Sequence, residues 1–179
     1  MIETVWSFCW KGIRPNLYRI LATTHPYLSG IIALSLDQNW LGSAKPVKVS
    51  DVTGVFVTYD TVVFGFTATA IALAIAIPST KFIEFLSSIK DGSTPFRDFL
   101  FILAWNGFVH IWAFILLIPP IVLGNDWTAG PPNEWYTRLY LVIMLWVQIY
   151  AVFQFLVTTI GVFELGDLYA KYVSKNRVQ

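Results

Sequence analysis

The stretch Thr58–Pro78, TYDTVVFGFTATAIALAIAIP, decides the class of this protein. From Thr61 to Pro78 it contains no ionisable residue. At a helical rise of about 1.5 Å per residue, a run of this length crosses the hydrocarbon layer of a bilayer. We therefore predict a transmembrane helix over about residues 58–78.

The composition of the whole chain also indicates a membrane protein. Of its 179 residues, 56% are hydrophobic and 13% are charged, whereas soluble domains have about 25% charged residues. The 12 Lys and Arg residues are matched by 11 Asp and Glu residues, so no strongly basic face is available and nucleic acid is not expected as a partner. The single cysteine, Cys9, excludes an intrachain disulfide and a cysteine-rich metal site.

The N-terminal segment 17–36, LYRILATTHPYLSGIIALSL, determines the number of crossings. It is long enough to span the membrane but contains Arg19, His25 and Pro26. If it crosses, nine of the basic residues lie on one side and three on the other, whereas without it they divide six against six. Cytoplasmic loops carry an excess of Lys and Arg. We therefore predict that the segment crosses, that both termini are cytoplasmic and that Pro26 kinks the helix near its middle.

The predicted architecture is a single transmembrane domain over residues 1–179, an all-α integral membrane protein with four transmembrane helices. An amphipathic helix over about 2–15 is expected in the interface, with packing under the bundle as the alternative. Amphipathic helix extensions are expected in the cytoplasm. An outer hairpin within Val47–Val63 is an alternative to helix there. The spans are expected at about 17–36, 58–78, 98–123 and 137–163, followed by a cytoplasmic tail over 164–179.

Proline and small residues modify two of these helices. Pro119 and Pro120 are expected to bend or end the third helix near its outer end. On the second helix, small residues recur at every fourth place, a spacing that lets two helix backbones approach closely in lipid. The predicted helix-packing residues are Gly65, Ala68, Ala72 and Ala76, with Ala70 and Ala74 as a parallel series.

Polar side chains within the spans are predicted to lie near one depth of the membrane. Counting about 1.5 Å per residue from the span ends gives their levels. Near the midplane we place His25, Thr67 or Thr69, His110 and Gln148, with Asn106 and Gln154 on its cytoplasmic side, Thr158 further along the same arc of the fourth helix and Asp60 at the outer mouth. These residues either hydrogen-bond between helices and fix their register, or line a path for ions or protons.

The sequence predicts a homo-oligomeric pore or channel-like assembly for ions or protons, which could perturb the membrane as an effector. The alternative is a membrane anchor or regulatory subunit with a further protein on its cytoplasmic face. A third interpretation is a b-type cytochrome anchor whose haem takes both histidines as axial ligands. No catalytic, phosphate-binding or metal-binding spacing is present, so we expect neither an enzyme nor a cofactor.

The expected location is a cell inner membrane, as a multi-pass protein in contact with lipid and with further copies of itself. The acidic residue Glu3 and the lack of a basic segment before an apolar run argue against a cleavable signal peptide.

One short motif resembles that of a known family. Arg19 and His25 have the R-x5-H spacing, which resembles the ribonuclease motif of HEPN domains and is also reported in a small pore-forming membrane family associated with RNA-targeting CRISPR effectors. The resemblance covers seven residues. Because both side chains are expected at membrane depth, where RNA does not reach, we assign them no role from it.

Overall fold

The computed structural model describes residues 18, 20–38, 47–76, 79–89, 95–123, 128–129 and 135–177. These residues are helical apart from short connections and one two-residue ladder, which confirms the predicted all-α class. The predicted interfacial helix over 2–15 lies outside the described residues. The elements are α3 (His25–Leu36), β1 (Val47–Lys48), α4 (Val49–Ala76), α5 (Thr80–Ile89), α6 (Pro95–Leu123), β2 (Thr128–Ala129) and α7 (Trp135–Arg177).

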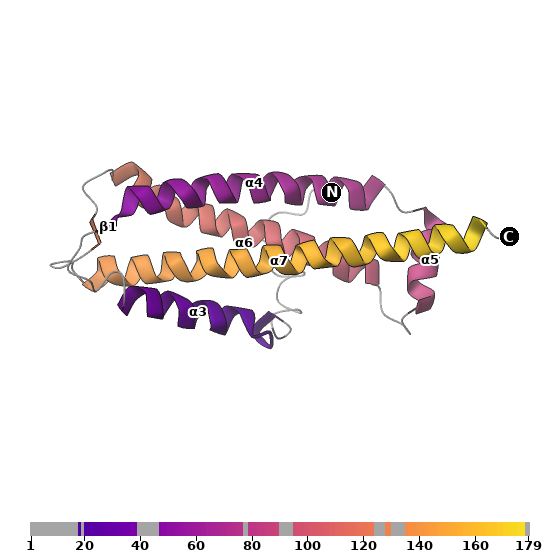
Figure 1. Cartoon of the computed structure of the whole chain (residues 1–179), viewed down its shortest axis with the longest axis horizontal. Coiled ribbons are helices and arrows are strands. Elements are labelled where there is room, and N and C mark those ends of the chain that lie inside the picture. Colours follow the sequence, from indigo (N-terminus) through magenta and orange to yellow (C-terminus); the bar gives the residue numbers. More distant parts are fainter. Residues whose placement is uncertain are drawn as a thin grey trace, which may run out of the picture.

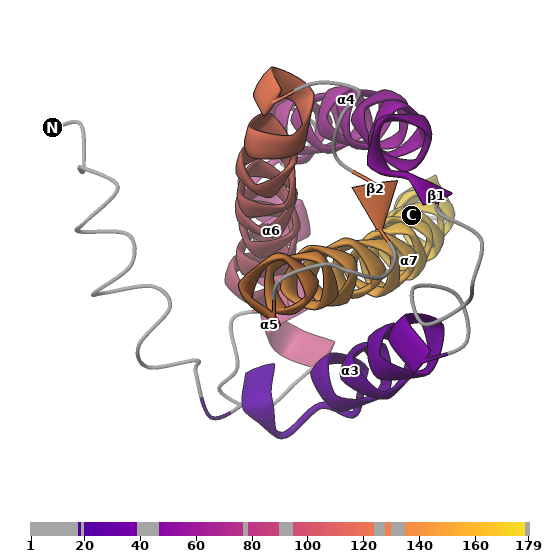
Figure 2. The same ribbon diagram turned by 90° about the vertical axis from the view of Figure 1, so that its left-hand side faces the viewer.

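Three of these helices, α4, α6 and α7, are long and apolar enough to cross a membrane. They run side by side along the long axis of the molecule, and α3 lies beside the first half of α7 (Figure 1). Seen end-on, the helices follow one another in the order α4, α6, α7 and α3, and α4 contacts α7 little (Figure 2). We call the end with β1 and β2 the ladder end, and the other the C-terminal end.

The contacts of α4 and α6 follow a spacing of alternately three and four residues. This is the 3.5-residue repeat of helices that pack knobs-into-holes. The remaining surface of both helices carries exposed apolar side chains, as expected for helices that face lipid. On α6 the buried series is Phe99, Leu103, Asn106, His110, Ala113, Leu117 and Pro120, and on α4 it includes Thr53, Asp60, Val63, Thr67, Ala70 and Ala74.

The N-terminal segment differs from the predicted continuous helix over 17–36. A turn occupies residues 22–24, and α3 begins at His25. Pro26 therefore lies in the first turn of a helix, where its missing N–H is not needed, and it does not kink a helix at its middle. The 12 residues of α3 cover about 18 Å, less than the hydrocarbon thickness of about 30 Å.

Small residues bring α3 close to α7. Ser29 and Ala33 are buried, and a Cβ atom added to Gly30 would lie 3.5 Å from the indole nitrogen of Trp146. That nitrogen donates a hydrogen bond to the carbonyl oxygen of Pro26 at 2.8 Å. Small residues on α3 thus let its backbone approach α7 closely, as they do in other helix pairs that pack in lipid. We call this contact the α3–α7 seam.

An ion pair fixes the ladder end of the seam. The guanidinium group of Arg138, in the first turn of α7, donates hydrogen bonds to both carboxylate oxygens of Asp37, which directly follows α3, at 2.7 to 3.0 Å. The Asp37 side chain is 9% exposed and that of Arg138 is 53% exposed. The pair thus joins the end of α3 to the beginning of α7.

The two prolines of α6 do not end the helix, and α7 compensates for one of the backbone hydrogen bonds that they remove. Pro119 and Pro120 lie inside α6, which continues to Leu123. Because Pro120 has no N–H, the carbonyl oxygen of Leu116 loses its helical donor. The hydroxyl group of Tyr140 on α7 donates a hydrogen bond to that oxygen. A neighbouring helix thus replaces the missing bond, which is how proline is tolerated in membrane helices.

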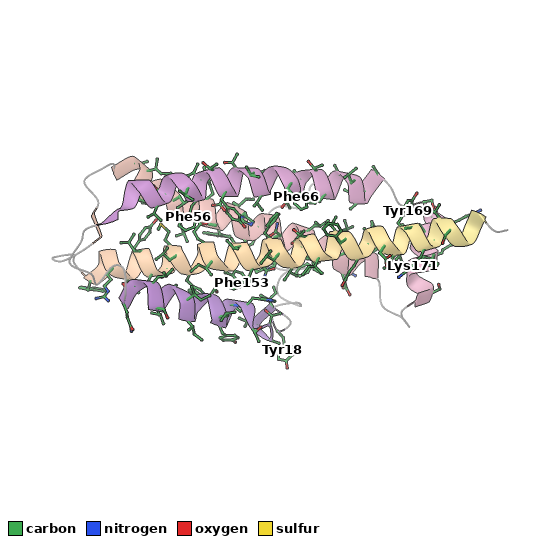
Figure 3. All side chains as sticks on the ribbon, viewed as in Figure 1. Tyr18, Phe56, Phe66, Phe153, Tyr169 and Lys171 are labelled. Atoms are coloured by element: carbon green, nitrogen blue, oxygen red, sulfur yellow. The ribbon has the colours of Figure 1, made fainter. Side chains whose placement is uncertain are left out.

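The C-terminal end is covered by α5, which runs across the bundle (Figure 1). Phe82 and Leu86 are buried, and the ring centroid of Phe82 lies 5.1 Å from that of Tyr169 and 5.4 Å from that of Tyr172. Tyr169 marks the last turns of α7 in Figure 3. With 43 residues, or about 64 Å, α7 is longer than a bilayer is thick and extends through the expected tail.

Candidate functional site

Asp60, His110 and Gln148 form a buried polar cluster to which α4, α6 and α7 each contribute one side chain. We call it the Asp60 cluster. The Nδ1 atom of His110 lies 2.8 Å from Oδ1 of Asp60. The Nε2 atom of Gln148 donates to the other carboxylate oxygen of Asp60 and to the carbonyl oxygen of Ala113, both at 3.1 Å. The three residues are 2%, 1% and 0% exposed, so the cluster is closed to its surroundings.

Asp60, predicted at the outer mouth, lies within the candidate span of α4. The candidate span of α4 starts at Val52, so Asp60 lies eight residues, or about 12 Å, inside it. His110 is near the centre of the candidate span of α6, which covers Phe96–Val122. In a membrane crossed by these helices, the cluster would lie at a depth where a charged side chain is expensive unless it is paired.

Several buried polar atoms in and near the cluster have no hydrogen-bond partner among the described residues. A buried polar atom left without a partner costs about 1–3 kcal/mol. Tyr59, whose hydroxyl is one of these atoms, packs its ring on that of His110, with centroids 5.7 Å apart. The atoms are the Tyr59 hydroxyl oxygen, His110 Nε2, Gln148 Oε1, Asn106 Oδ1 and Thr158 Oγ1.

Two further polar groups continue from the cluster toward the C-terminal end. The amide nitrogen of Asn106 donates to the hydroxyl oxygen of Thr67 at 2.7 Å, and that hydroxyl donates to the carbonyl oxygen of Val63 at 2.8 Å. On α7, Gln154 hydrogen-bonds the hydroxyl group of Tyr150, which also accepts a bond from Trp105. The structure thus brings Asp60, His110 and Gln148 together, and separately pairs Thr67 with Asn106.

His25 is not part of the Asp60 cluster. Its ring packs against Phe153, with centroids 5.9 Å apart, and Figure 3 shows Phe153 on the side of α7 that faces α3. His25 and His110 therefore lie at different sites and do not face each other as the two axial ligands of one haem. No group of three or more His, Cys, Asp or Glu residues in the described part of the chain is arranged to hold a metal ion.

A cavity of about 360 Å³ contains His25 and lies between the start of α3 and helices α6 and α7. Its lining combines a histidine, an acidic residue and one amide, Gln154. Its polar lining residues are Thr23, His25, Asp98, Trp105, Tyr150 and Gln154. We call it the His25 cavity.

The small residues of α4 divide between two faces. Ala70 and Ala74 are buried and pack with Phe99 and Leu103 of α6. The predicted helix-packing residues Gly65, Ala68, Ala72 and Ala76 are exposed. Within the chain, the contact of α4 is therefore made by the parallel series, and packing of the exposed series against another copy remains a prediction.

The pairing of Asp60 with His110 was not recognised from the sequence. The 3.5-residue repeat on α6, which runs from Phe99 through His110 to Leu117, would have indicated that His110 lies in the helix contact. The same repeat on α4 relates Asp60 to Thr67. Comparison of the chain with protein-family models, with curated proteins and with solved structures gives no match.

Proposed function

We propose that this chain is a multi-pass membrane protein whose copies assemble into a channel-like complex that conducts protons or small ions. The observation that supports this most is the Asp60 cluster, an acid and a histidine buried together within two candidate spans. Ionisable residues at such depth are rare and usually belong to ion pathways or proton relays. The unpartnered atoms around the cluster favour a functional role, because full pairing would serve stability better.

We further propose that the N-terminal segment completes a fourth crossing. Asp37 lies at the level of Arg138 and His25 at the level of Phe153, so α3 follows 15 residues, or about 22 Å, of α7. Residues 18–24 would cross the rest of the hydrocarbon layer. With four crossings, the excess of basic residues places both termini in the cytoplasm of a cell with an inner membrane.

The order of polar groups suggests a route for protons. It would start at the His25 cavity, pass Gln154 and the pair of Asn106 and Thr67, and reach Asp60. Because the cluster is closed to solvent, transport through one copy suits protons, which move between hydrogen-bonded groups. A hydrated ion would need a path between copies.

Self-association is part of the proposal because α4 lies at one end of the row of helices (Figure 2). Its exposed face carries Gly65, Ala68, Ala72 and Ala76. In lipid, close backbone approach over small residues is a main source of helix association. A second copy is the partner that the proposal requires at this face.

The test is proton flux into liposomes that contain only this chain, driven by a potassium diffusion potential and followed with an enclosed pH-sensitive dye. Asp60→Asn keeps the size of the side chain but not its ability to titrate, so the flux should fall by at least about tenfold. Asp37→Asn is the matched control, because Asp37 is the other largely buried acid described and lies in the α3–α7 seam. The control should conduct like the wild type.

Two results would reject the proposal: wild-type liposomes that do not acidify, or equal flux from wild type and Asp60→Asn. In the alternative function, that of an anchor or regulatory subunit, α5 would offer an apolar face to a soluble partner. In the structure Phe82 and Leu86 of α5 are already buried within the chain. Liposomes that conduct only after a second protein is added would nevertheless favour that alternative.

A further inference from the structure

The His25 cavity, unlike the Asp60 cluster, has polar groups that a ligand can reach. Its volume of about 360 Å³ lies within the range of about 300–1,000 Å³ that is usual for small-molecule sites. His25, Asp98 and Tyr150 line it and are partly exposed. The three residues of the Asp60 cluster, in contrast, are at most 2% exposed. A ligand in the His25 cavity would therefore contact polar side chains directly.

The cavity has a charged end and an aromatic end. Its wall on α6 is a single helix face, formed by the residues at positions 98, 101, 102 and 105. Asp98 lies in the first turn of α6 and close to the start of the candidate span Phe96–Val122. Trp105 follows seven residues, or about 10 Å, deeper in that span. The carboxylate thus marks the end of the cavity nearest the start of the span, and the indole marks the deeper end.

Hydrogen bonds within the chain use two of the donors in the lining and leave acceptors. The indole nitrogen of Trp105 donates to the hydroxyl oxygen of Tyr150 at 3.1 Å. The hydroxyl group of Thr23 donates to the carbonyl oxygen of Ile20 at 2.7 Å, so the Thr23 oxygen still has its lone pairs. An ionised carboxylate only accepts and offers about four lone-pair sites, so Asp98 can bind a ligand in addition to other groups. The lining therefore matches a ligand that donates hydrogen bonds.

The charge of the lining selects a cation. Among the described residues that line the cavity none is Lys or Arg, so a phosphate or carboxylate group would meet no permanent positive charge there. An ammonium group has three donors and no acceptor, which matches the Asp98 carboxylate and the Thr23 oxygen. The rings of Phe101 and Trp105 suit an apolar group or the face contact of a cation. The Trp105 ring is held in place by stacking on Phe108, with centroids 5.6 Å apart.

We infer that the His25 cavity binds a primary ammonium group attached to an apolar body, with the ammonium group on Asp98 and the body against Phe101 and Trp105. Two sources offer this chemistry, a free amine and the headgroup of phosphatidylethanolamine. The inference concerns equilibrium binding. It can therefore fail while the proposed conduction holds, and the reverse is also true.

The experiment measures binding of 2-phenylethylamine to the purified full-length chain in phosphatidylcholine nanodiscs, by equilibrium dialysis with empty nanodiscs as the blank. The comparison ligand is 2-phenylethanol, which has the same ring and arm but a neutral hydroxyl group. Hydrogen bonds between two charged groups are stronger than neutral ones. The amine should therefore bind at least about tenfold more tightly than the alcohol, which corresponds to about 1.4 kcal/mol.

A pair of substitutions tests the role of the carboxylate. Asp98→Asn keeps the size of the side chain and should lower amine binding by at least about tenfold while leaving alcohol binding unchanged. Glu164→Gln is the matched control, because Glu164 is an exposed acid toward the C-terminal end of α7 that does not line the cavity. The control variant should bind the amine like the wild type.

A second pair tests the location. Val157→Trp fills the cavity from its wall on α7 and should lower binding of the amine by at least about tenfold. Leu156→Trp is the matched control, since Leu156 is 51% exposed and does not line the cavity. Circular dichroism and the unfolding midpoint in detergent identify any variant that does not fold.

Equal binding of amine and alcohol to the wild type would overturn the inference, and so would unchanged amine binding to Asp98→Asn or to Val157→Trp. Equal losses in Asp98→Asn and Glu164→Gln would overturn it too, because they would indicate attraction to the general negative charge at this end. Nanodiscs that also contain phosphatidylethanolamine distinguish the two sources. Displacement of the amine supports the lipid headgroup as the ligand, and unchanged amine binding supports a free amine.

Discussion

The α3–α7 seam and the Asp60 cluster both bury polar groups within helix contacts, but they do so in different ways. In the seam, the carboxylate of Asp37 meets Arg138, and the carbonyl oxygen of Pro26 accepts bonds from Trp146 and from Ser29. In the Asp60 cluster, Nε2 of His110 and Oε1 of Gln148 have no partner among the described residues. The polar groups of the seam named above are thus paired within the chain, whereas these two atoms of the cluster are not.

This difference distinguishes a helix contact that stabilises the fold from one that we propose to be functional. A seam of small residues with paired polar groups is what close helix packing in lipid requires. The Asp60 cluster contains more polar groups than packing needs, and its ion pair would be replaced without loss by apolar side chains if stability alone counted. This contrast agrees with our proposal that the cluster, and not the seam, serves the protein's activity.

The largest effect is expected when only one partner of the Asp60–His110 pair is removed. Asp60→Leu leaves His110 buried without its carboxylate and should lower the free energy of unfolding by about 3–5 kcal/mol. The double variant Asp60→Leu/His110→Leu removes both partners and should regain most of that loss. Unfolding in mixed detergent micelles, titrated with a denaturing detergent, measures both values. A double variant as unstable as the single one would show that the cluster is structural.

The next largest effect concerns the seam. Leucine at Gly30 cannot fit against the indole of Trp146 and should lower the free energy of unfolding by about 1–3 kcal/mol. Gly30→Ala should be tolerated, because its Cβ atom would meet that ring at ordinary contact distances of 3.5–3.9 Å. As a control, Gly65→Leu should leave the stability of a single copy unchanged, since a Cβ atom there meets nothing within 4 Å. Equal losses at both glycines would mean that close packing is not what distinguishes the seam.

The sequence predicted the helical class and the three long helices, because long apolar runs have few other stable forms in lipid. The depth of Asp60 in the membrane stays a prediction. The apolar run was expected to begin at Thr58, which places Asp60 at its mouth, whereas α4 begins at Val49. The nine additional residues come from the β-branched segment for which a hairpin was the alternative. Within this segment Thr53 is buried.

Two other features could not be predicted from the local sequence, because they depend on contacts with a neighbouring helix. Proline at position 26 fits either a kink or the first turn of a helix, and the local sequence around it is compatible with both. Small residues at every fourth place occur on two faces of α4, and only the side chains of Phe99 and Leu103 on α6 determine that Ala70 and Ala74 are buried. Contacts between distant segments of the chain, and not periodicity, thus decided these points.

A smaller effect is expected for a hydrogen bond outside the seam, the one from Tyr140 to the backbone of α6. Tyr140→Phe removes the donor to the carbonyl oxygen of Leu116 and should cost about 0.6 kcal/mol, with an upper value of about 1.7 kcal/mol, as for other side-chain hydrogen bonds in membranes. In a Pro120→Ala background the cost should disappear, because alanine restores the helical N–H. A double-mutant cycle of unfolding free energies gives the comparison. The same loss in both backgrounds would show that Tyr140 acts through packing alone.

The smallest effect is expected at the exposed edge of the seam. The Arg138 side chain is 53% exposed, so its charge is screened by salt and contributes little. Arg138→Gln keeps a hydrogen-bond donor for Asp37 and should lower the unfolding midpoint slightly at low salt only. Raising the ionic strength from about 0.1 M to about 1 M shortens the screening length from about 10 Å to about 3 Å. Wild type and variant should therefore converge, whereas a difference that persists in high salt would mean that pairing at this edge contributes as much to the seam as its small residues do.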